Sequence, residues 1–519
     1  MIRQLNSRRN DLAPISALPP ELFGRIFTFV QIAGSVPEIE DFEYPYTFNF
    51  TSWLNFTYVS QKWRNIALNT PGLWDTPDFL YPMWARAMLE RSKGTDLIIN
   101  CDTSIITDPA VIKEVFDNHS ARIREINLRG LTSSFLFSIL ENIWSSSESL
   151  RLRSLQLVRA FPREDDNPDF PYFPAHLLVQ PSGLQRLEVR HCGLDKWYTQ
   201  PHPLLTHLVV ETTHDRPLLS EFVTALSGMP ALERLEMVDS LPLGPGAMKS
   251  GLKVALSRLS FLRLSSTEDF FEVLNVLDFL IVPCTTRIYL ACVKITSQVI
   301  QLPHIGFPLC RFLSSMTGNV ERSYNWLYLS YSGNTFYLSA CTNEQSHDPM
   351  TTDLRLSLSL THSNHQLDHF LDRILPGIPL FNLQTLLIDI TSGHDAIIRY
   401  FGQSLTLQKV VLQYKVVVSD FLHATTPKPD GYEHLESAYY SIPFPTLQSL
   451  HFFRTRFRDI NWGEVSDCLM ERYERGAGLQ KLYICICYDV GEDKVRLLRE
   501  IVPDVEWDGI QVRSLFDFL

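Results

Sequence analysis

The feature of this sequence that most constrains its fold is a short apolar-x-apolar pattern that returns from about residue 95 to the end. The copies lie 21 to 40 residues apart, with a mean of about 29. Alternating apolar residues are typical of a strand that buries one face. The pattern occurs at Leu97/Ile99, Ile126/Leu128, Leu155/Leu157, Leu187/Val189, Leu208/Val210, Leu235/Met237, Leu262/Leu264, Ile288/Leu290, Leu327/Leu329, Leu356/Leu358, Leu386/Ile388, Val410/Leu412, Leu450/Phe452, Leu482/Ile484 and Val505/Trp507.

Amphipathic helices are predicted between these strands, at residues 133–144, 219–229, 268–280, 365–375 and 461–476. A single strand–helix unit cannot bury its own apolar face, whereas many stacked units share a continuous core. The sequence therefore predicts an α/β array over residues 96–519, with parallel strands inside and helices outside.

One unit carries a fuller version of the pattern. In "LQRLEVRHCGL", residues 184–194, the apolar and cysteine positions follow L-x-x-L-x-L-x-x-C-x-L. This segment resembles a leucine-rich repeat, and the wandering spacing of the copies implies an irregular leucine-rich-repeat solenoid. Cys192 is then a packing residue at the turn after the strand and not a metal ligand.

The first 94 residues lack the pattern and predict three helices. The first, in "ISALPPELFGRIFTFV" (15–30), opens at two prolines, where a missing N–H does no harm. The second, in "VSQKWRNIALNTPGLW" (59–74), stops at the Asn-Thr-Pro-Gly breaker. The third, in "PMWARAMLERSKG" (82–94), is expected to end with Gly94 in the left-handed position after the helix.

The first two helices carry a recognisable motif. "LPPELFGRIF", then "VSQKWRNIAL" and "TPGLW", resemble the F-box, a helical module that binds a Skp-type adaptor protein. The continuation "LERSKGTDLIINCD" and "VPDVEWDG" near the C-terminus are similar to fungal F-box proteins with leucine-rich repeats.

The resemblance implies a function. It makes the chain the substrate-recognition subunit of an SCF-type cullin-RING ubiquitin ligase, which binds a Skp-type adaptor, and through it a cullin, while the repeats bind a protein substrate. The adaptor-binding residues that it implies are Leu18, Pro19, Glu21, Leu22, Ile26, Val59, Ser60, Trp63, Arg64, Pro71, Leu73 and Trp74.

An alternative stays open. Trp63 and Trp74 could be ordinary core residues of a helical cap on the array, and the chain a non-catalytic scaffold outside any ligase. The link over residues 34–53 is also longer than the usual F-box link. It is either a tolerated surface insertion, since loop length costs little entropy, or a segment that folds over the adaptor-binding surface and weakens binding.

These patterns predict four segments. Residues 1–14 form a flexible N-terminus, and residues 15–80 form the F-box-like domain. Residues 81–95 form a connecting helix, and residues 96–519 form the array.

The formal charge of −12 argues against nucleic acid as a partner, because an acidic chain repels phosphate backbones. The densest basic group, at 454–458, is interpreted as a solvated face. Neither a signal-peptide core nor a run of eighteen apolar residues is found, so no membrane segment is expected. Nine cysteines without framework spacing predict free thiols and a cytoplasmic or nuclear location. Cys485 and Cys487 are expected on one face of a strand.

No catalytic or cofactor-binding pattern is complete. The "GPGAMKS" segment (244–250) lacks the glycine that precedes the lysine of a phosphate-binding loop. His362, His365 and His369 lack the glutamate of the metalloprotease motif. We therefore expect no cofactor, no metal and no enzymatic activity in the chain itself.

Substrate binding is assigned to side chains between the apolar strand positions, which line the open face of such an array. In irregular repeats the same aromatic residues can instead cover a neighbouring helix. The candidates are Arg186, Glu188, Arg190, Trp326, Tyr328, Ser449, His451, Phe453, Lys481 and Tyr483.

Overall fold

The structure is a computed structural model of the chain. It describes residues 10, 12–35, 52–106, 108, 110–132, 152–159, 172–173, 183–194, 196–199, 201–213, 216–244, 253–295, 306–316, 323–332, 334–342, 352–360, 365–414, 418–425, 442–457 and 461–510. The chain is mixed α/β, with helices and a mostly parallel sheet. It divides into two compact units, residues 1–215 and 216–519.

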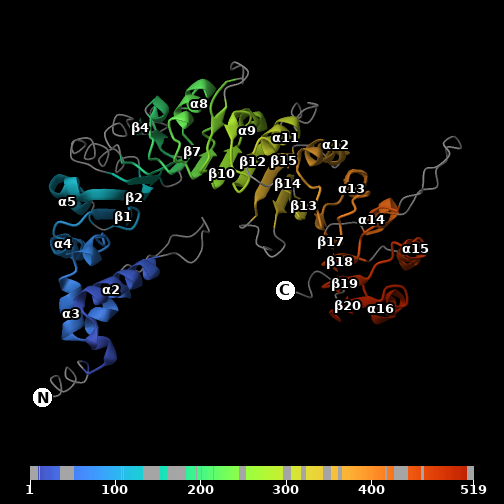
Figure 1. The fold of residues 1–519 in the computed structure, drawn as a ribbon, viewed down its shortest axis with the longest axis horizontal. Helices are drawn as coiled ribbons and strands as arrows, with labels where there is room; N and C mark the ends of the chain where they lie inside the picture. The colour runs from blue at the N-terminus through green and yellow to red at the C-terminus, as the bar shows by residue number, and fades with distance from the viewer. Residues whose placement is uncertain are drawn as a thin grey trace. The chain divides into compact units, whose positions relative to one another are not determined.

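The first unit begins with helices (Figure 1). They are η1 (Pro14–Ala17), α2 (Pro20–Ser35), η2 (Ser52–Tyr58), α3 (Gln61–Leu68), η3 (Pro71–Trp74) and α4 (Pro82–Arg91). The three predicted helices are confirmed as α2, α3 and α4. Gly94 is not the left-handed residue, however. Helix α4 ends at Arg91, and Lys93 takes the positive φ of 51°. Of the predicted insertion, residues 36–51 lie outside the described residues, as does the predicted helix 133–144.

Five parallel strands follow in the first unit, in the sheet order β1-β2-β3-β5-β7. They are β1 (Leu97–Asp102), β2 (Ile123–Leu131), β3 (Ser154–Arg159), β5 (Arg186–Arg190) and β7 (His207–Glu211). Helix α5 (Ala110–His119) and η4 (Ser120–Arg122) connect β1 to β2, η5 (Trp197–Thr199) lies between β5 and β7, and two short strands, β4 (Tyr172–Phe173) and β6 (Gly193–Leu194), pair with each other.

In the described residues of the second unit, eleven strands form the larger sheet, in the order β8-β10-β12-β15-β14-β13-β16-β17-β18-β19-β20. They are β8 (Arg234–Val238), β10 (Phe261–Ser266), β12 (Arg287–Ile295), β13 (Trp326–Ser332), β14 (Thr335–Cys341), β15 (Leu354–Leu360), β16 (Thr385–Asp389), β17 (Lys409–Gln413), β18 (Ser449–Phe453), β19 (Lys481–Cys485) and β20 (Asp504–Trp507). The small strands β9 (Val254–Ala255) and β11 (Leu280–Ile281) pair separately.

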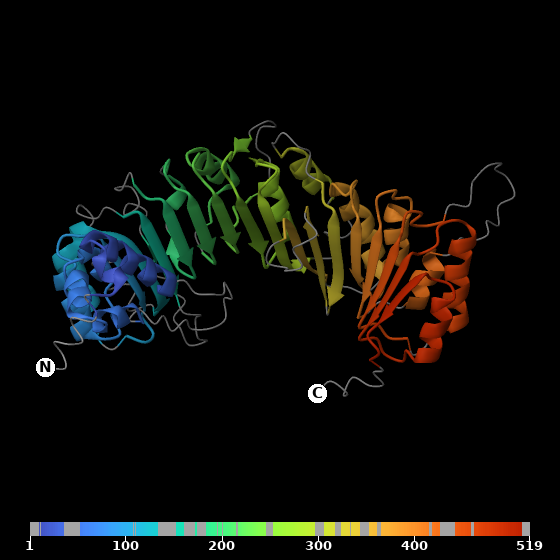
Figure 2. The same cartoon turned by 60° about the horizontal axis from the view of Figure 1, so that its bottom comes forward.

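The helices of the second unit all lie on one face of its sheet (Figure 2). They are α8 (Leu219–Ser227), α9 (Phe270–Leu277), α11 (Gly306–Ser314), α12 (His365–Ile374), with η7 (Leu375–Gly377) after it, α13 (His394–Phe401), α14 (Val418–Thr425), α15 (Trp462–Glu474) and α16 (Glu492–Arg499). The other face carries the half-exposed side chains of the strands. We call it the open face.

The apolar pairs fall on strands at every predicted position, and most neighbouring pairs are in register. Between β1 and β2 and between β12 and β15 the match is offset by one alternate position, so that Ile99 pairs with Ile126 and Leu290 with Leu356. Leu155 and Leu157 of β3, for example, pair with Leu187 and Val189 of β5. The pattern could be read because each strand buries alternate side chains under the helices, and a slip of one residue would expose them.

One strand breaks the predicted parallel order. Strand β14 is antiparallel to both of its neighbours, β13 and β15. Ser332 pairs with Thr335, so β13 and β14 form a hairpin with a two-residue connection. Phe336 and Leu338 of β14 are buried and supply the apolar alternation of a further strand. The prediction of exclusively parallel strands is therefore wrong at this hairpin.

Many strands end in a residue with left-handed backbone. His191, Asp239, Tyr414, Arg454 and Ile486 each follow a strand and have φ between 34° and 57°. Such a conformation costs a non-glycine residue roughly 1–2 kcal/mol. Four of these residues are held by backbone hydrogen bonds to the end of the next strand, from His191, Asp239, Tyr414 and Arg454 at 2.9, 2.9, 3.3 and 3.0 Å. The turn directs the chain from the sheet towards the helix side.

This turn also overturns the prediction for the Cys485/Cys487 pair. Ile486 between them is left-handed (φ 52°), so the alternation of the strand stops at Cys485. Cys485 is half-exposed on the open face, whereas Cys487 is buried and contacts the Phe452 carbonyl at 3.3 Å. Within the described part of the chain, no helix is long and apolar enough to cross a membrane.

Candidate protein-binding surfaces

The N-terminal helices surround a core of stacked aromatic rings. Phe23 and Phe27 of α2 lie 5.3 and 5.4 Å from the Trp63 ring of α3, measured between ring centroids. Phe27 also stacks on Phe56 of η2 at 3.9 Å. Trp53 meets Trp74 edge-on at 5.2 Å. These contacts fix the angle between α2 and α3 and therefore which sides of both helices face outward.

Trp74 is a core residue. Its indole N–H donates to the Ala67 carbonyl at 2.9 Å, and the Arg91 guanidinium lies over its ring at 4.5 Å. Trp74 and Leu73 are both buried, so the structure does not place them on a surface that a partner could touch. For these two residues the core interpretation holds, because the Pro-Gly turn folds them back under α3.

Four other predicted residues shape the helices. The Ser60 hydroxyl caps α3 by accepting from the Trp63 backbone N–H at 3.1 Å. Pro71 is half-buried and opens η3. Leu18 and Trp63 are half-buried and pack against the aromatic core. These side chains are positioning elements more than contact surface.

The remaining predicted adaptor contacts are exposed. Glu21, Leu22 and Ile26 lie on the outer side of α2, and Pro19 directly precedes this helix. Arg64 lies in the first turn of α3, and Val59 precedes its cap residue.

Helix α2 also exposes two apolar residues that were not among the predicted contacts, Phe29 and Val30. The exposed fractions of Leu22, Ile26, Phe29 and Val30 are 42%, 39%, 71% and 47%. Their spacing of three, four, seven and eight residues places them along one side of the helix. We call these four residues the α2 stripe. Their spacing was legible in the sequence, but only the burial of Phe23 and Phe27 shows which side is inside.

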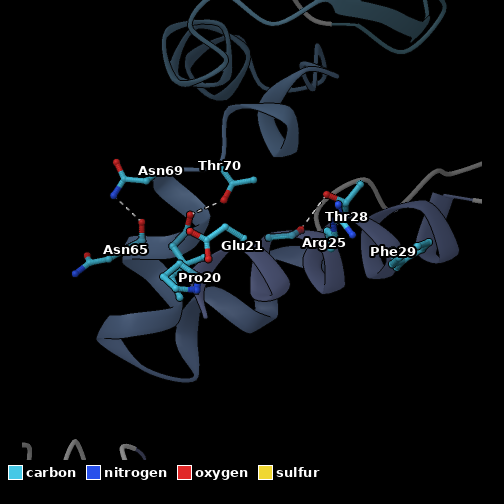
Figure 3. Close-up of a pocket in the computed structure, with 10 residues that line it drawn as sticks. Pro20, Glu21, Arg25, Thr28, Phe29, Asn65, Asn69 and Thr70 are labelled. Carbon is cyan, nitrogen blue, oxygen red and sulfur yellow. Dashed lines mark hydrogen bonds between the residues drawn. The ribbon is translucent and has the colours of Figure 1, made fainter. Parts of the chain in front are cut away.

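A groove of about 800 Å³ lies beside the stripe, between α2 and the end of α3 (Figure 3). Its lining includes Gly24, Arg25 and Phe29 from α2 and Asn69 and Thr70 from the breaker. The Asn69 and Thr70 side chains donate to the carbonyls of Asn65 and Ile66 at 2.9 and 2.8 Å, which ends α3 there. The outer surface of α2 thus presents both the α2 stripe and the adjoining groove.

The helices are joined firmly to the first strands. The Ile98 backbone N–H of β1 donates to the Asp75 carbonyl at 2.9 Å, and Arg122 reaches the Ser92 hydroxyl at 2.6 Å. Burial raises the pKa of the Asp75 carboxyl to about 6. Arg86 pairs with Glu114 of α5 at 2.9 Å.

In the first unit, the predicted charged residues on the half-exposed face of the strands neutralise one another. Arg190 pairs with Glu188 and with Glu211 of β7, both at 2.7 Å. Arg186 is exposed on the same face, two residues before Glu188. Most of the charge at this place is therefore balanced within the chain.

In the second unit, Trp326 is buried, contrary to its prediction as an exposed contact residue. The reason is the unexpected strand β14, which places Cys341 directly opposite it. Tyr328 is half-buried, and its hydroxyl donates to Asp389 at 3.5 Å. Burial raises the pKa of the Tyr328 hydroxyl.

The predicted C-terminal residues do come together on the open face. The His451 and Tyr483 rings lie 5.1 Å apart, and Lys481 pairs with Glu506. Burial, followed by the charges of Lys409 and Lys481, lowers the pKa of His451 to about 4. Its Nε2 lies 2.7 Å from the Ser449 hydroxyl. Phe453 meets Tyr414 edge-on at 6.3 Å.

Among the described residues, no group of three or more His, Cys, Asp or Glu side chains could hold a metal ion. Of the histidine triplet, His369 is exposed, while His362 lies outside the described residues. Cys192 is buried as predicted, and burial raises its thiol pKa to about 12. A scan of protein-family models finds no match for this chain, and a search of curated proteins finds no relative.

Proposed function

We propose that the chain is the substrate-recognition subunit of an SCF-type ubiquitin ligase. In this proposal residues 15–80 are an F-box that binds a Skp-type adaptor, and the strand–helix units are a leucine-rich-repeat solenoid that holds a protein substrate. The observation that carries it is the α2 stripe. It leaves apolar side chains exposed on the helix that begins within the Leu-Pro-x-Glu motif of the resemblance.

The stripe is large enough to matter energetically. Its four side chains expose the equivalent of about two whole apolar residues. Covering them would contribute roughly 3–6 kcal/mol, at about 1.5–3 kcal/mol per fully buried side chain. A contiguous apolar stripe of this kind is a common mark of a protein-binding surface. The groove beside it offers room for side chains of the partner.

The role proposed for the chain is binding only. The strand array would hold the substrate near the ubiquitin-loaded enzyme and so raise the local concentration of a target lysine. The reactive cysteine would belong to another protein, in the cytoplasm or nucleus.

A second function, a scaffold in which the helices merely cap the array, is favoured by one set of contacts. Trp74 is buried, and the hydrogen bonds from Ile98 to Asp75 and from Arg122 to Ser92 tie the helices to the first strands. A cap needs these contacts, but it gains nothing from leaving Phe29 and Ile26 exposed. The two proposals therefore differ at the stripe.

Co-expression with a Skp-type adaptor separates them. The wild-type chain should copurify with the adaptor, and the double variant Ile26→Ser/Phe29→Ser should not. Tyr473→Ser/Leu497→Ser is a matched control, because these residues of α15 and α16 are 63% and 39% exposed, close to the 71% and 39% of Phe29 and Ile26. Failure of the folded wild-type chain to bind the adaptor, or equal binding by both double variants, would favour the scaffold.

A further inference from the structure

Four neighbouring strands of the second unit carry basic and aromatic side chains on the open face. The register places Glu236 of β8 beside Arg263 of β10, Arg263 beside Tyr289 of β12, and Tyr289 beside Arg355 of β15. Arg234 lies on the same face two residues before Glu236, and Arg287 lies on it two residues before Tyr289. We call these six residues the arginine–tyrosine patch.

Tyr289 is the centre of the patch. The guanidinium carbons of Arg263 and Arg355 each lie 5.2 Å from the centre of its ring. A stacked guanidinium is held by its flat face, and its N–H groups remain available as donors along the edge. The half-buried Tyr289 ring thus orients two arginine forks next to each other.

The charges of the patch are not balanced. Its single carboxylate, Glu236, is 1% exposed and contacts Arg234 at 2.5 Å and Arg263 at 3.5 Å. Among the described residues no carboxylate pairs with Arg287 or Arg355. Arg263 Nε is buried and has no hydrogen-bond partner in the described part of the chain. Four arginines against one glutamate leave a local charge of +3 in a chain whose formal charge is −12.

The patch differs from the other charged places on strands. Arg190 is paired with Glu188 and Glu211, and Lys481 with Glu506 and Asp504. In both places the chain supplies the carboxylates. At the arginine–tyrosine patch it supplies too few, which leaves excess positive charge that is complementary to an anionic partner.

We infer that the patch binds an extended peptide segment that carries clustered anionic groups, either carboxylates or phosphates. The arginine guanidinium groups can donate two parallel hydrogen bonds to either a carboxylate or a phosphate, and the tyrosine ring adds apolar surface between them. The acidic remainder of the chain would repel such a segment elsewhere and so direct it to this place. The inference names the class of substrate segment for the strand array, and it rests on the proposed function in that respect.

The first test measures peptide binding to the full chain by fluorescence anisotropy. Three labelled peptides of equal length carry four glutamates, four phosphoserines or four glutamines. We expect at least one anionic peptide to bind roughly tenfold or more tightly than the glutamine peptide, and the affinity to fall as salt rises. The two anionic arms identify the source of the charge. Equal binding of all three peptides would overturn the inference, as would tighter binding of a single-stranded RNA oligonucleotide.

The second test assigns the binding to the patch. Arg263→Gln/Arg355→Gln should weaken anionic-peptide binding at least about tenfold. Arg399→Gln/Arg496→Gln makes the same change of charge on the helices α13 and α16, and it should weaken binding less than about twofold. The single variant Arg355→Lys keeps the charge and loses the planar fork, so it should show an intermediate loss even if the double variant folds poorly. Equal losses of peptide affinity in the patch and control variants would refute the assignment. Wild-type affinity in both Arg355→Lys and Arg263→Gln/Arg355→Gln would refute it as well.

The same variants distinguish this inference from the proposed function. If the wild-type chain copurifies with the adaptor but does not bind the anionic peptides, only the inference is overturned. Peptide binding without adaptor copurification would overturn only the ligase role.

Discussion

Two phenylalanines on one helix should respond in opposite ways to truncation. Phe23 and Phe29 both belong to α2, but Phe23 is fully buried against Phe27 and Trp63, whereas Phe29 is 71% exposed. Removing a buried phenylalanine costs about 3–5 kcal/mol. An exposed substitution changes stability by about 0.5 kcal/mol or less in either direction, and alanine is the better helix former.

Hydrogen exchange of the backbone amides measures this difference locally. Phe23→Ala should raise the opening equilibrium of α2 and α3 by about two to three and a half orders of magnitude, since each 1.4 kcal/mol is a factor of ten. Phe29→Ala should leave exchange in both helices near the wild-type rate.

The opposite outcome would be an acceleration of exchange by Phe29→Ala as large as that by Phe23→Ala. That result would mean that Phe29 is packed in the isolated chain, and the α2 stripe would then not be an available surface. The strands β16–β20 provide an internal reference, because neither substitution should alter exchange there.

Three further predictions concern buried ionisable groups. Burial raises the pKa of Asp75 from 3.8 to about 6, so the native state holds the proton more tightly and stability falls as pH rises through that interval. Asp75→Asn should remove this slope in urea unfolding of the first unit. His451 behaves in the opposite sense. Its pKa is lowered from 6.5 to about 4 by burial and then by Lys409 and Lys481, so stability is lost as pH falls from 6.5 towards 4, and His451→Gln should flatten the loss. Arg472 is buried and donates to two backbone carbonyls at 2.7 and 2.8 Å. Arg472→Gln should therefore lower the unfolding free energy of the C-terminal strands by about 2–4 kcal/mol, measured by hydrogen exchange, whereas an unchanged value would show that water replaces these bonds.

The strand positions could be predicted because their signal is local. Each apolar pair, such as Leu187 and Val189, lies within three residues and reports the burial of one face directly. Strand β14 was not predicted, because its apolar residues, Phe336 and Leu338, belong to a hairpin and not to a strand–helix unit. The Gly-Asn dipeptide at 333–334 was its sequence signal.

The surfaces were harder to predict, because exposure is a property of packing. Trp74 and Trp326 fit the composition of binding surfaces, yet both are buried, the first by a turn and the second beside an unforeseen strand. Basic residues of the arginine–tyrosine patch, such as Arg263 and Arg355, are far apart in sequence. Only the register of the strands brings them to either side of Tyr289.

If a Skp-type adaptor covers the outer side of α2, a hydrogen-exchange footprint of the purified complex will locate it there. Exchange in residues 20–31 should slow on addition of saturating adaptor, whereas exchange in the strands β19 and β20 should stay unchanged. Unchanged exchange in residues 20–31, or protection confined to the strand array, would show that the adaptor does not bind α2.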